Sequence, residues 1–251
     1  MAKVIILGSS NAIPTAEHDN THLVIVGDQR ILLIDTASNP ILRLDRAGVD
    51  VTRVTDLILT HFHPDHVSGV PLLLLDSWLM GRQMPLNIYG LGDTLDRTEH
   101  LMALFGWEHW PGFFPVSFFR LLPEENSPVI ESPEFSVTAS PVQHMVPNIG
   151  LRVQFHQSGR TLAYSSDTSP CQEVVRLASG ADVLIHEATG EEHGHTSAAQ
   201  AGEIASQAGA RKLLLIHYDP EEKEPQQLVN QAKTTFPGPV ELAFDFMEFV
   251  L

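Results

Sequence analysis

The sequence predicts an α/β protein built on mixed β-sheets. Apolar, β-branched segments alternate with helical patterns over most of the 251 residues, as they do in α/β architectures. The first strands follow one another as hairpins before any helix begins, so antiparallel pairs should occur beside parallel ones. No repeat and no Ser/Gly linker divides the chain, and we expect a single domain that covers residues 1–251.

The individual elements follow from periodicity and from the turn residues between them. Short apolar segments predict strands, in chain order, at 3–7, 22–27, 31–35, 55–60, 86–89, 117–122, 135–141, 149–156, 160–165, 182–186, 212–217 and 240–250. Helical spacing predicts helices at about 39–48, 69–80, 92–105, 171–179, 197–209 and 224–235. Ser197 and Gln200 fit a capping box, and Gly209 stands where that helix should end.

Composition narrows the function classes. No apolar run approaches the roughly 18 residues that a membrane span needs, so no membrane partner is expected. Cys171 is the only cysteine and the N-terminus has no signal-peptide pattern, which together indicate a cytoplasmic protein. The net charge of -16, with 15 Lys plus Arg and no basic run, disfavours nucleic acid as a partner and favours a small molecule.

The most informative segment is residues 60–66, Thr-His-Phe-His-Pro-Asp-His. It offers four possible metal ligands within six positions, His61, His63, Asp65 and His66. Imidazole and carboxylate without a nearby thiolate are the donors that suit Zn²⁺ or a similar divalent ion. A solvated polar loop is the alternative, but the segment directly follows an apolar strand and Pro64 stiffens it.

Five predicted strands end in a residue of the metal-binding or carboxylate type. These residues are Asp35, His61, Asp167, the pair His186 and Glu187, and His217. Because ligands of open α/β sheets bind at the carboxyl ends of the strands, the five ends together predict a site.

Three further residues are candidate ligands, each with a structural alternative. His144 follows a strand and on its own would be a surface histidine. Asp167 precedes a turn and would otherwise cap the helix at 171. His217 ends an apolar strand and would otherwise be a buried core histidine.

With these residues in place, the sequence resembles the metallo-β-lactamase superfamily over nearly its whole length. Asp35 matches the first motif of that family, and His61-Phe62-His63-Pro64-Asp65-His66 matches the HxHxDH second motif. His144, Asp167 and His217 match the third, fourth and fifth motifs in order. The resemblance implies an αββα sandwich, in which two mixed sheets lie face to face between outer helices.

The resemblance also implies two bound divalent ions, of which Zn²⁺ is the first choice and Mn²⁺ or Fe²⁺ the alternatives. His61, His63 and His144 would bind one ion, Asp65, His66 and His217 the other, and Asp167 would bridge them. Asp35 would orient ligand histidines. A hydroxide that bridges the two ions would attack the substrate.

Within the superfamily, the sequence is most similar to the ribonuclease Z group and related small phosphodiesterases. Its N-terminal glycine loop, Tyr164-Ser165-Ser166-Asp167-Thr168, His186-Glu187-Ala188-Thr189 and Gly194-His195-Thr196-Ser197 carry this likeness. By this resemblance His195 acts at the scissile phosphate and Glu187 orients it. Together with Asp65 of the second motif, these two are the candidate catalytic residues. A flexible polar loop is the structural alternative for His195.

One departure from the ribonuclease Z pattern bears on the substrate. That group has a tRNA-binding arm between the third and fourth motifs, whereas only 22 residues (145 to 166) separate His144 from Asp167 here. We therefore expect a phosphodiesterase that acts on a small or cyclic phosphodiester. The alternatives are a tRNA 3′-processing endonuclease, a lactone or ester hydrolase and, last, a non-enzymatic binding protein.

An aromatic cluster at 105–119 has two interpretations. It consists of Phe105, Trp107, Trp110, Phe113, Phe114, Phe118 and Phe119. Local core or a subunit interface is the favoured interpretation, in keeping with a possible homodimer, and a lid over an apolar substrate is the alternative.

Overall fold

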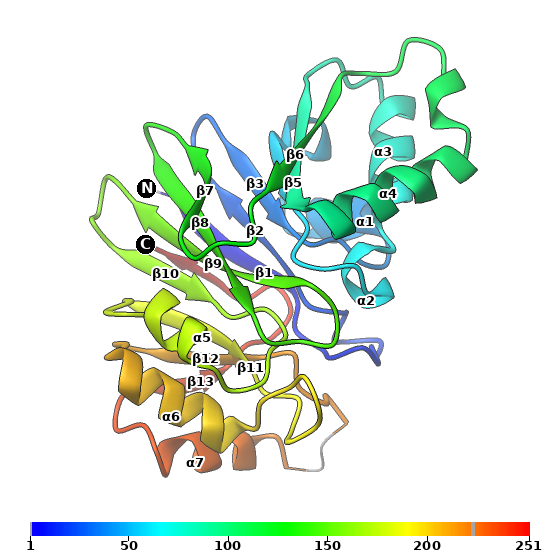
Figure 1. The fold of residues 1–251 in the computed structure, drawn as a ribbon. Helices are drawn as coiled ribbons and strands as arrows, with labels where there is room; N and C mark the ends of the chain where they lie inside the picture. The colour runs from blue at the N-terminus through cyan, green and yellow to red at the C-terminus, as the bar shows by residue number, and fades with distance from the viewer. Residues whose placement is uncertain (1, 222–223) are drawn as a thin grey trace.

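Two seven-stranded β-sheets lie face to face in the computed structural model, which describes residues 2–221 and 224–251. Helices cover the outer side of each sheet, and the two chain ends lie close together at one side of the sandwich (Figure 1). The αββα sandwich of two mixed sheets that the sequence predicts is therefore confirmed.

The first sheet holds the strands of the N-terminal half of the chain together with β14, the last strand. In spatial order it contains β14 (Glu248–Val250), β1 (Lys3–Gly8), β2 (His22–Val26), β3 (Ile31–Ile34), β4 (Asp56–Ile58), β5 (Leu86–Leu91) and β6 (Val116–Leu121). Strands β14 to β3 pair antiparallel, and β3 to β6 pair parallel. The parallel part places the carboxyl ends of β3 and β4 side by side.

The second sheet repeats this plan with the C-terminal half. Its order is β13 (Val240–Leu242), β12 (Leu213–Ile216), β11 (Val183–Glu187), β10 (Thr161–Tyr164), β9 (Asn148–Phe155), β8 (Phe135–Val142) and β7 (Ser127–Glu131). Strands β13 to β10 pair parallel and β10 to β7 antiparallel. The carboxyl ends of β10, β11 and β12 thus lie next to one another.

Three apolar layers hold the sandwich together. The middle layer joins the inner faces of the two sheets through side chains such as Val4, Leu23, Phe135 and Ile185. Helices α1 (Pro40–Arg46), α3 (Val70–Leu79) and α4 (Gly92–Leu104) cover the first sheet, and α5 (Gln172–Leu177), α6 (Ala198–Ala208) and α7 (Gln226–Lys233) cover the second (Figure 1). Two 3₁₀ turns, Val51–Arg53 and Trp107–His109, and the short helix α2 (Pro64–Val67) complete the elements. In the part of the chain that the structure describes, no helix is both long and apolar enough to cross a membrane.

Three sequence-based expectations about elements are wrong. The single strand expected at 240–250 is two strands in different sheets, because the chain turns at 243–247, where Phe246 has a φ of 66°. Strand β7 was not expected, since Pro128 lies within it; β7 is an edge strand, where a missing N–H is tolerated. The segment at 64–67 is one helical turn rather than a loop, with Pro64 at its first position.

One contact between the sheets fixes the β2–β3 hairpin. The Glu134 carboxylate accepts hydrogen bonds from three consecutive backbone N–H groups of the hairpin turn, those of Asp28, Gln29 and Arg30. Glu134 directly precedes β8 of the second sheet, so this carboxylate ties the two sheets together at the end of the sandwich where β2 ends and β3 begins.

Candidate metal centre

The polar residues that end the strands meet at one edge of the sandwich. Asp35 and His61 follow β3 and β4 of the first sheet. In the second sheet Asp167 and His217 follow β10 and β12, and Glu187 ends β11. All five are buried. The two parallel blocks bring their carboxyl ends to the same edge, which is why residues far apart in the chain converge.

A first cluster consists of His61, His63 and His144. The Nε2 atom of His61 lies 3.0 Å from Nδ1 of His63, and Nε2 of His144 lies 3.2 Å from the same Nδ1. Burial lowers the pKa of all three imidazoles, most strongly that of His61. Neutral imidazoles have a lone pair to offer, so the cluster is suited to hold a cation.

A second cluster consists of Asp65, His66, Asp167 and His217, whose possible ligand atoms all lie within 4.8 Å of one another. Oδ2 of Asp167 lies 3.4 Å from Nε2 of His66 and 3.4 Å from Nε2 of His217. The same oxygen lies 3.8 Å from Nε2 of His61 in the first cluster. Asp167 therefore stands between the clusters, where the bridging ligand was expected.

Asp35 and Thr60 set the tautomers of two of these histidines from outside. The Asp35 carboxylate can only accept, so His66 donates its Nδ1–H to Oδ2 over 2.9 Å. The Thr60 hydroxyl donates to the same Oδ2 over 2.7 Å and therefore accepts from Nδ1 of His61 at 3.1 Å. The Nε2 lone pairs of both histidines are left to face the clusters.

Two further acceptors do the same for His144 and His217. The carbonyl of Gly194 accepts the Nδ1–H of His144 over 2.8 Å. Thr189 donates its hydroxyl to the His217 carbonyl over 2.7 Å, and hence accepts the Nδ1–H of His217 over 2.8 Å. In both rings the outer partner engages Nδ1, so four histidines direct Nε2, the nitrogen that can bind a cation, toward the centre.

The residues present fit divalent cations. Among the described residues, Nε2 of His66, Nε2 of His217 and Oδ1 of Asp167 are buried and have no hydrogen-bond partner. Such atoms are costly unless a ligand satisfies them. Burial alone would lower the pKa of His66, but the nearby carboxylates, led by Asp167, raise it well above its usual value, so the site favours positive charge. Imidazole and carboxylate donors suit Zn²⁺, Mn²⁺ or Fe²⁺.

Backbone strain accompanies the site residues. Asp35, Ser166 and His217 have positive φ angles of 58°, 54° and 53°. This left-handed conformation is uncommon for residues other than glycine and is held only when the surroundings determine it. Each of the three is a site residue or its neighbour within two residues of a strand end, so the strained turns aim the side chains into the site.

Glu187 and His195 form a buried pair at the rim of the second cluster. Oε1 of Glu187 accepts from Nδ1 of His195 over 3.1 Å and from the backbone N–H groups of Thr168 and Thr196, each over 3.1 Å. Burial alone would lower the pKa of His195, but Glu187 outweighs it and raises that pKa. The His195 ring stacks on His217 with centroids 5.8 Å apart, so its loop is anchored rather than a free polar loop.

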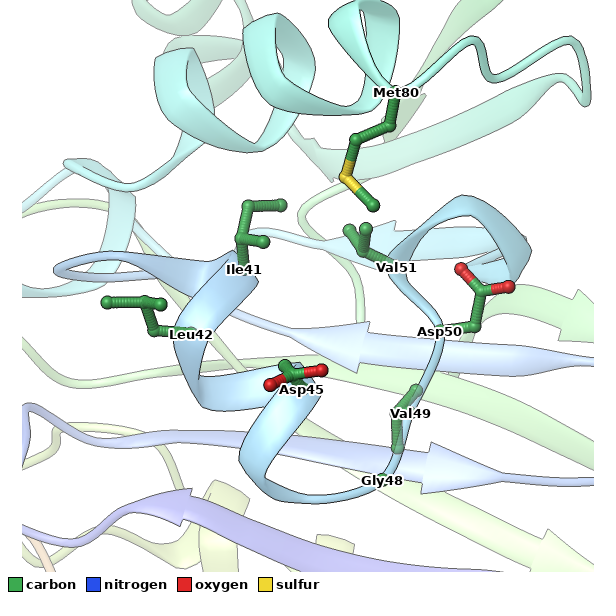
Figure 2. A pocket seen from close by; sticks show the side chains of 8 residues that line it. All are labelled: Ile41, Leu42, Asp45, Gly48, Val49, Asp50, Val51 and Met80. Carbon is green, nitrogen blue, oxygen red and sulfur yellow. The ribbon is translucent and has the colours of Figure 1, made fainter.

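The centre opens into a cleft of about 430 Å³. His63, Asp65, Asp167, His195 and His217 line its floor, and residues of the loop 11–13 together with Met145, Glu192 and Asp219 complete its wall. A separate depression of about 500 Å³, shown in Figure 2, is formed by α1, the segment 48–51 and Met80. Its lining contains no histidine among the described residues, so the chemistry belongs to the cleft.

The aromatic cluster lies apart from this cleft. Phe114 is buried, and Trp107, Trp110, Phe113 and Phe118 pack against the core beneath the helices of the first sheet. Trp110 also stacks on Trp78 of α3 with centroids 5.2 Å apart. None of the seven aromatic residues is among the residues that line the cleft, and five of them pack in the core whereas Phe105 and Phe119 are exposed.

Sequence reasoning missed several residues that support the site. Thr60, Thr189 and Gly194 supply the partners of ligand histidines, and the loop 11–13 forms one wall of the cleft. Thr60 and Thr189 directly flank motif residues at strand ends, which is the signal that could have found them. Gly194 is used through its backbone carbonyl, which residue type does not reveal.

Three comparisons place the chain among known proteins. Residues 30–218 match the model of the β-lactamase superfamily domain. The ribonuclease Z of Methanothermobacter thermautotrophicus is 28% identical over an alignment of 292 residues, which covers 94% of this chain and 93% of that protein. The short form of human tRNase Z has a similar structure, with a TM-score of 0.79 and 25% identity over 99% of this chain and 98% of that one. A metallo-β-lactamase fold protein from Bacillus subtilis aligns with a TM-score of 0.83 and 24% identity, over 99% and 98% of the two chains.

Proposed function

The chain belongs to the β-lactamase superfamily and is a hydrolase of that family, and on this premise we propose that it is a two-metal phosphodiesterase that acts on a small or cyclic phosphodiester. The observation that carries the proposal is the Glu187–His195 pair beside the two ligand clusters. Lactone hydrolysis would use the same clusters, and its leaving alkoxide would also take a proton from His195, so the substrate panel below separates the two reactions.

The clusters define which residues would hold the ions. His61, His63 and His144 would bind one ion, Asp65, His66 and His217 the second, and Asp167 would contact both. Two divalent ions, with Zn²⁺ as first choice, would supply an activated water and neutralise charge on the phosphate oxygens. The tautomers set by Asp35, Thr60, Thr189 and Gly194 hold the nitrogens ready for this binding.

His195 would act on the leaving group. Glu187 holds Nδ1–H, which leaves Nε2 as the nitrogen free to carry a proton toward the cleft. As the oxygen of water bonds to phosphorus, the bond from phosphorus to the leaving oxygen breaks, and His195 donates its proton to that oxygen. Glu187 stabilises the charged imidazole before transfer, and such general acid catalysis contributes about 10²- to 10⁴-fold.

Chain length supports a small substrate. Strands β9 and β10 are joined by a turn at Gly159, and His144 and Asp167 flank this hairpin without an inserted arm. The alignment with the Methanothermobacter enzyme spans 292 residues although this chain has 251, so that relative contains segments that this chain lacks. The second candidate function is tRNA 3′-processing, which the names of the ribonuclease Z relatives favour.

A substrate panel on metal-loaded and chelator-treated protein tests the proposal. The panel contains an activated phosphodiester, cyclic nucleotides, a phosphomonoester, an acyl-homoserine lactone and precursor tRNA. We expect metal-dependent cleavage of the small diesters, with His195→Ala retaining its metal and losing about 10²-fold or more in rate. Efficient cleavage of precursor tRNA without cleavage of small diesters would overturn the proposal in favour of the second candidate.

A further inference from the structure

The wall of the cleft carries four side chains that the hydrolytic residues do not use. Ile13 and Met145 are large apolar residues that are 71% and 53% exposed. Glu192 and Asp219 are exposed carboxylates. All four line the cleft that opens over the ligand clusters.

Ile13 is exposed although its backbone is held in place. The Ser10 hydroxyl donates to the Ile13 carbonyl over 2.6 Å, and the Ile13 N–H donates to Oδ1 of Asn11 over 2.9 Å. The loop is tied to the metal-ligand strand as well, because the N–H of His217 donates to the Ser9 carbonyl over 2.9 Å. Ile13 thus presents a large, exposed apolar side chain to the cleft from a loop whose backbone is held, where it is in a position to contact a ligand.

Met145 lines the cleft beside the other cluster. It directly follows His144, and a Cβ built on Gly194 would lie 3.1 Å from Cγ of Met145, so the glycine leaves room for this side chain. Methionine adapts its shape to a flat or irregular apolar partner. Ile13 and Met145 thus offer the cleft two apolar contacts.

The charges of the cleft oppose a second phosphate. The two divalent ions of the proposed function would more than offset the charges of Asp65 and Asp167, whereas Glu192 and Asp219 lie at the wall as exposed carboxylates. Among the described residues that line the cleft, none is Lys or Arg. A substrate with a further phosphate next to the scissile one would therefore place like charges together.

We propose, building on the function proposed above, that the cleft selects a phosphodiester with one phosphate and an uncharged, flat apolar flank such as a nucleobase or aryl ring. Ile13 and Met145 contact the flank, and Glu192 and Asp219 reject substrates that carry a second phosphate. These four are specificity-determining residues for the hydrolysis rather than members of the catalytic group.

Two substrates with the same leaving group test the apolar contact. Thymidine 5′-(p-nitrophenyl phosphate) and methyl p-nitrophenyl phosphate both lose the p-nitrophenyl group. They differ only in the group that stays on phosphorus, and this retained group is the flank that the proposal concerns. In Ile13→Asn and Met145→Gln, we expect KM for the thymidine substrate to rise about five- to tenfold, the effect of losing part of an apolar contact. The kcat for the thymidine substrate and both kinetic constants for the methyl substrate should stay within twofold of the unmodified protein. As a control, Leu104→Asn, which changes a residue on α4 as exposed as Ile13, should leave the constants for both substrates within twofold.

The outcomes separate the inference from the function on which it rests. Hydrolysis of neither substrate by metal-loaded protein would defeat the proposed function. Hydrolysis of both with equal KM, or variants that impair both substrates alike, would defeat the apolar selection alone.

A 3′-phosphorylated thymidine substrate tests the charge selection. We expect kcat/KM at least tenfold below that of the unphosphorylated substrate, and the double variant Glu192→Gln/Asp219→Asn should recover severalfold of this loss. High salt should also shrink the discrimination, since the carboxylates are exposed. Glu131→Gln, which neutralises an exposed carboxylate on β7, should change nothing. Equal rates for the two substrates in the unmodified protein would refute the role of the carboxylates.

Discussion

Replacing Asp35 with asparagine tests whether tautomer control holds the metal centre together. The carboxylate accepts from the Thr60 N–H over 2.8 Å with Oδ1, and from the Thr60 hydroxyl and Nδ1–H of His66 with Oδ2. An asparagine amide has one oxygen and one NH₂ group. In the place of Asp35, its NH₂ group must therefore face a donor that the carboxylate accepted from. If the NH₂ group faces His66, the ring must move its proton to Nε2 and lose the lone pair aimed at the centre.

The expected loss follows from this single proton. Removal of such an orienting partner costs about 10- to 100-fold in metal affinity, which equals about 1.4 to 2.7 kcal/mol. Asparagine is suited to the test because it tolerates the positive φ of 58° at this position, whereas alanine would add backbone strain. Metal retained against a competing chelator is the measurement, together with the shift of the melting temperature on adding metal.

Asp56→Asn is the matched control for Asp35→Asn. Asp56 is equally buried and begins β4, at the opposite end of the strand that leads to His61. It pairs with Arg30 at 2.8 Å, so its replacement should destabilise the fold while metal affinity stays unchanged. Wild-type metal retention by Asp35→Asn, or an equal loss in Asp56→Asn, would refute the reasoning.

Three further predictions concern the surroundings of the site. Gly194→Ala should lower both metal content and turnover at least tenfold, because Gly194 has a φ of 86° and a Cβ would lie 3.0 Å from Nδ1 of His144; unchanged metal content would contradict this. Glu134→Gln should lower the free energy of unfolding by about 1–3 kcal/mol in urea titrations, since three backbone N–H groups lose a charged acceptor, with kcat unaffected. Burial and then Asp56 raise the pKa of Tyr89 to about 12, above the value near 10 of an unfolded chain, so stability should be lost as the pH rises from about 10 to 12. Tyr89→Phe should flatten this part of the pH–stability curve, and parallel curves for the two proteins would rule the assignment out.

The sequence predicts the α/β pattern and most strands because their apolar runs end at turn residues. The sequence does not predict the elements whose position depends on pairing between segments that lie far apart in the chain. Residues 240–250 contain no glycine or proline, so nothing local marks the turn that moves the chain from β13 in one sheet to β14 in the other. Strand β7 is missed for the opposite reason. Pro128 is a local signal against a strand, and only the position of β7 at the edge of the sheet makes a proline acceptable there.

The candidate ligands could be predicted because their residue types are unusual at strand ends. Seven side chains from four segments meet at one edge, and each was named from its place after a strand or in the 61–66 motif. Among their partners Asp35 was named, whereas Gly194 could not be, because it acts through a backbone carbonyl that has no residue signature. Thr60 and Thr189 lie next to or within the motif segments, and that position is the signal that the sequence offers for them. The ligands can thus be named from their residue types, whereas part of what orients them, such as the Gly194 carbonyl, depends on backbone geometry.

This division explains why the chemistry is easier to predict than the substrate. The ligand clusters derive from strand ends that the fold must bring together, since parallel strands share one carboxyl edge. The cleft wall derives from the loops that carry Ile13, Met145, Glu192 and Asp219, and loop positions are not fixed by strand pairing. Loop residues can therefore change the accepted flank of a phosphodiester while the metal clusters stay intact. If a variant of these four residues altered metal retention as strongly as Asp35→Asn, the cleft wall would also determine metal binding. Substrate specificity would then not be separable from hydrolysis.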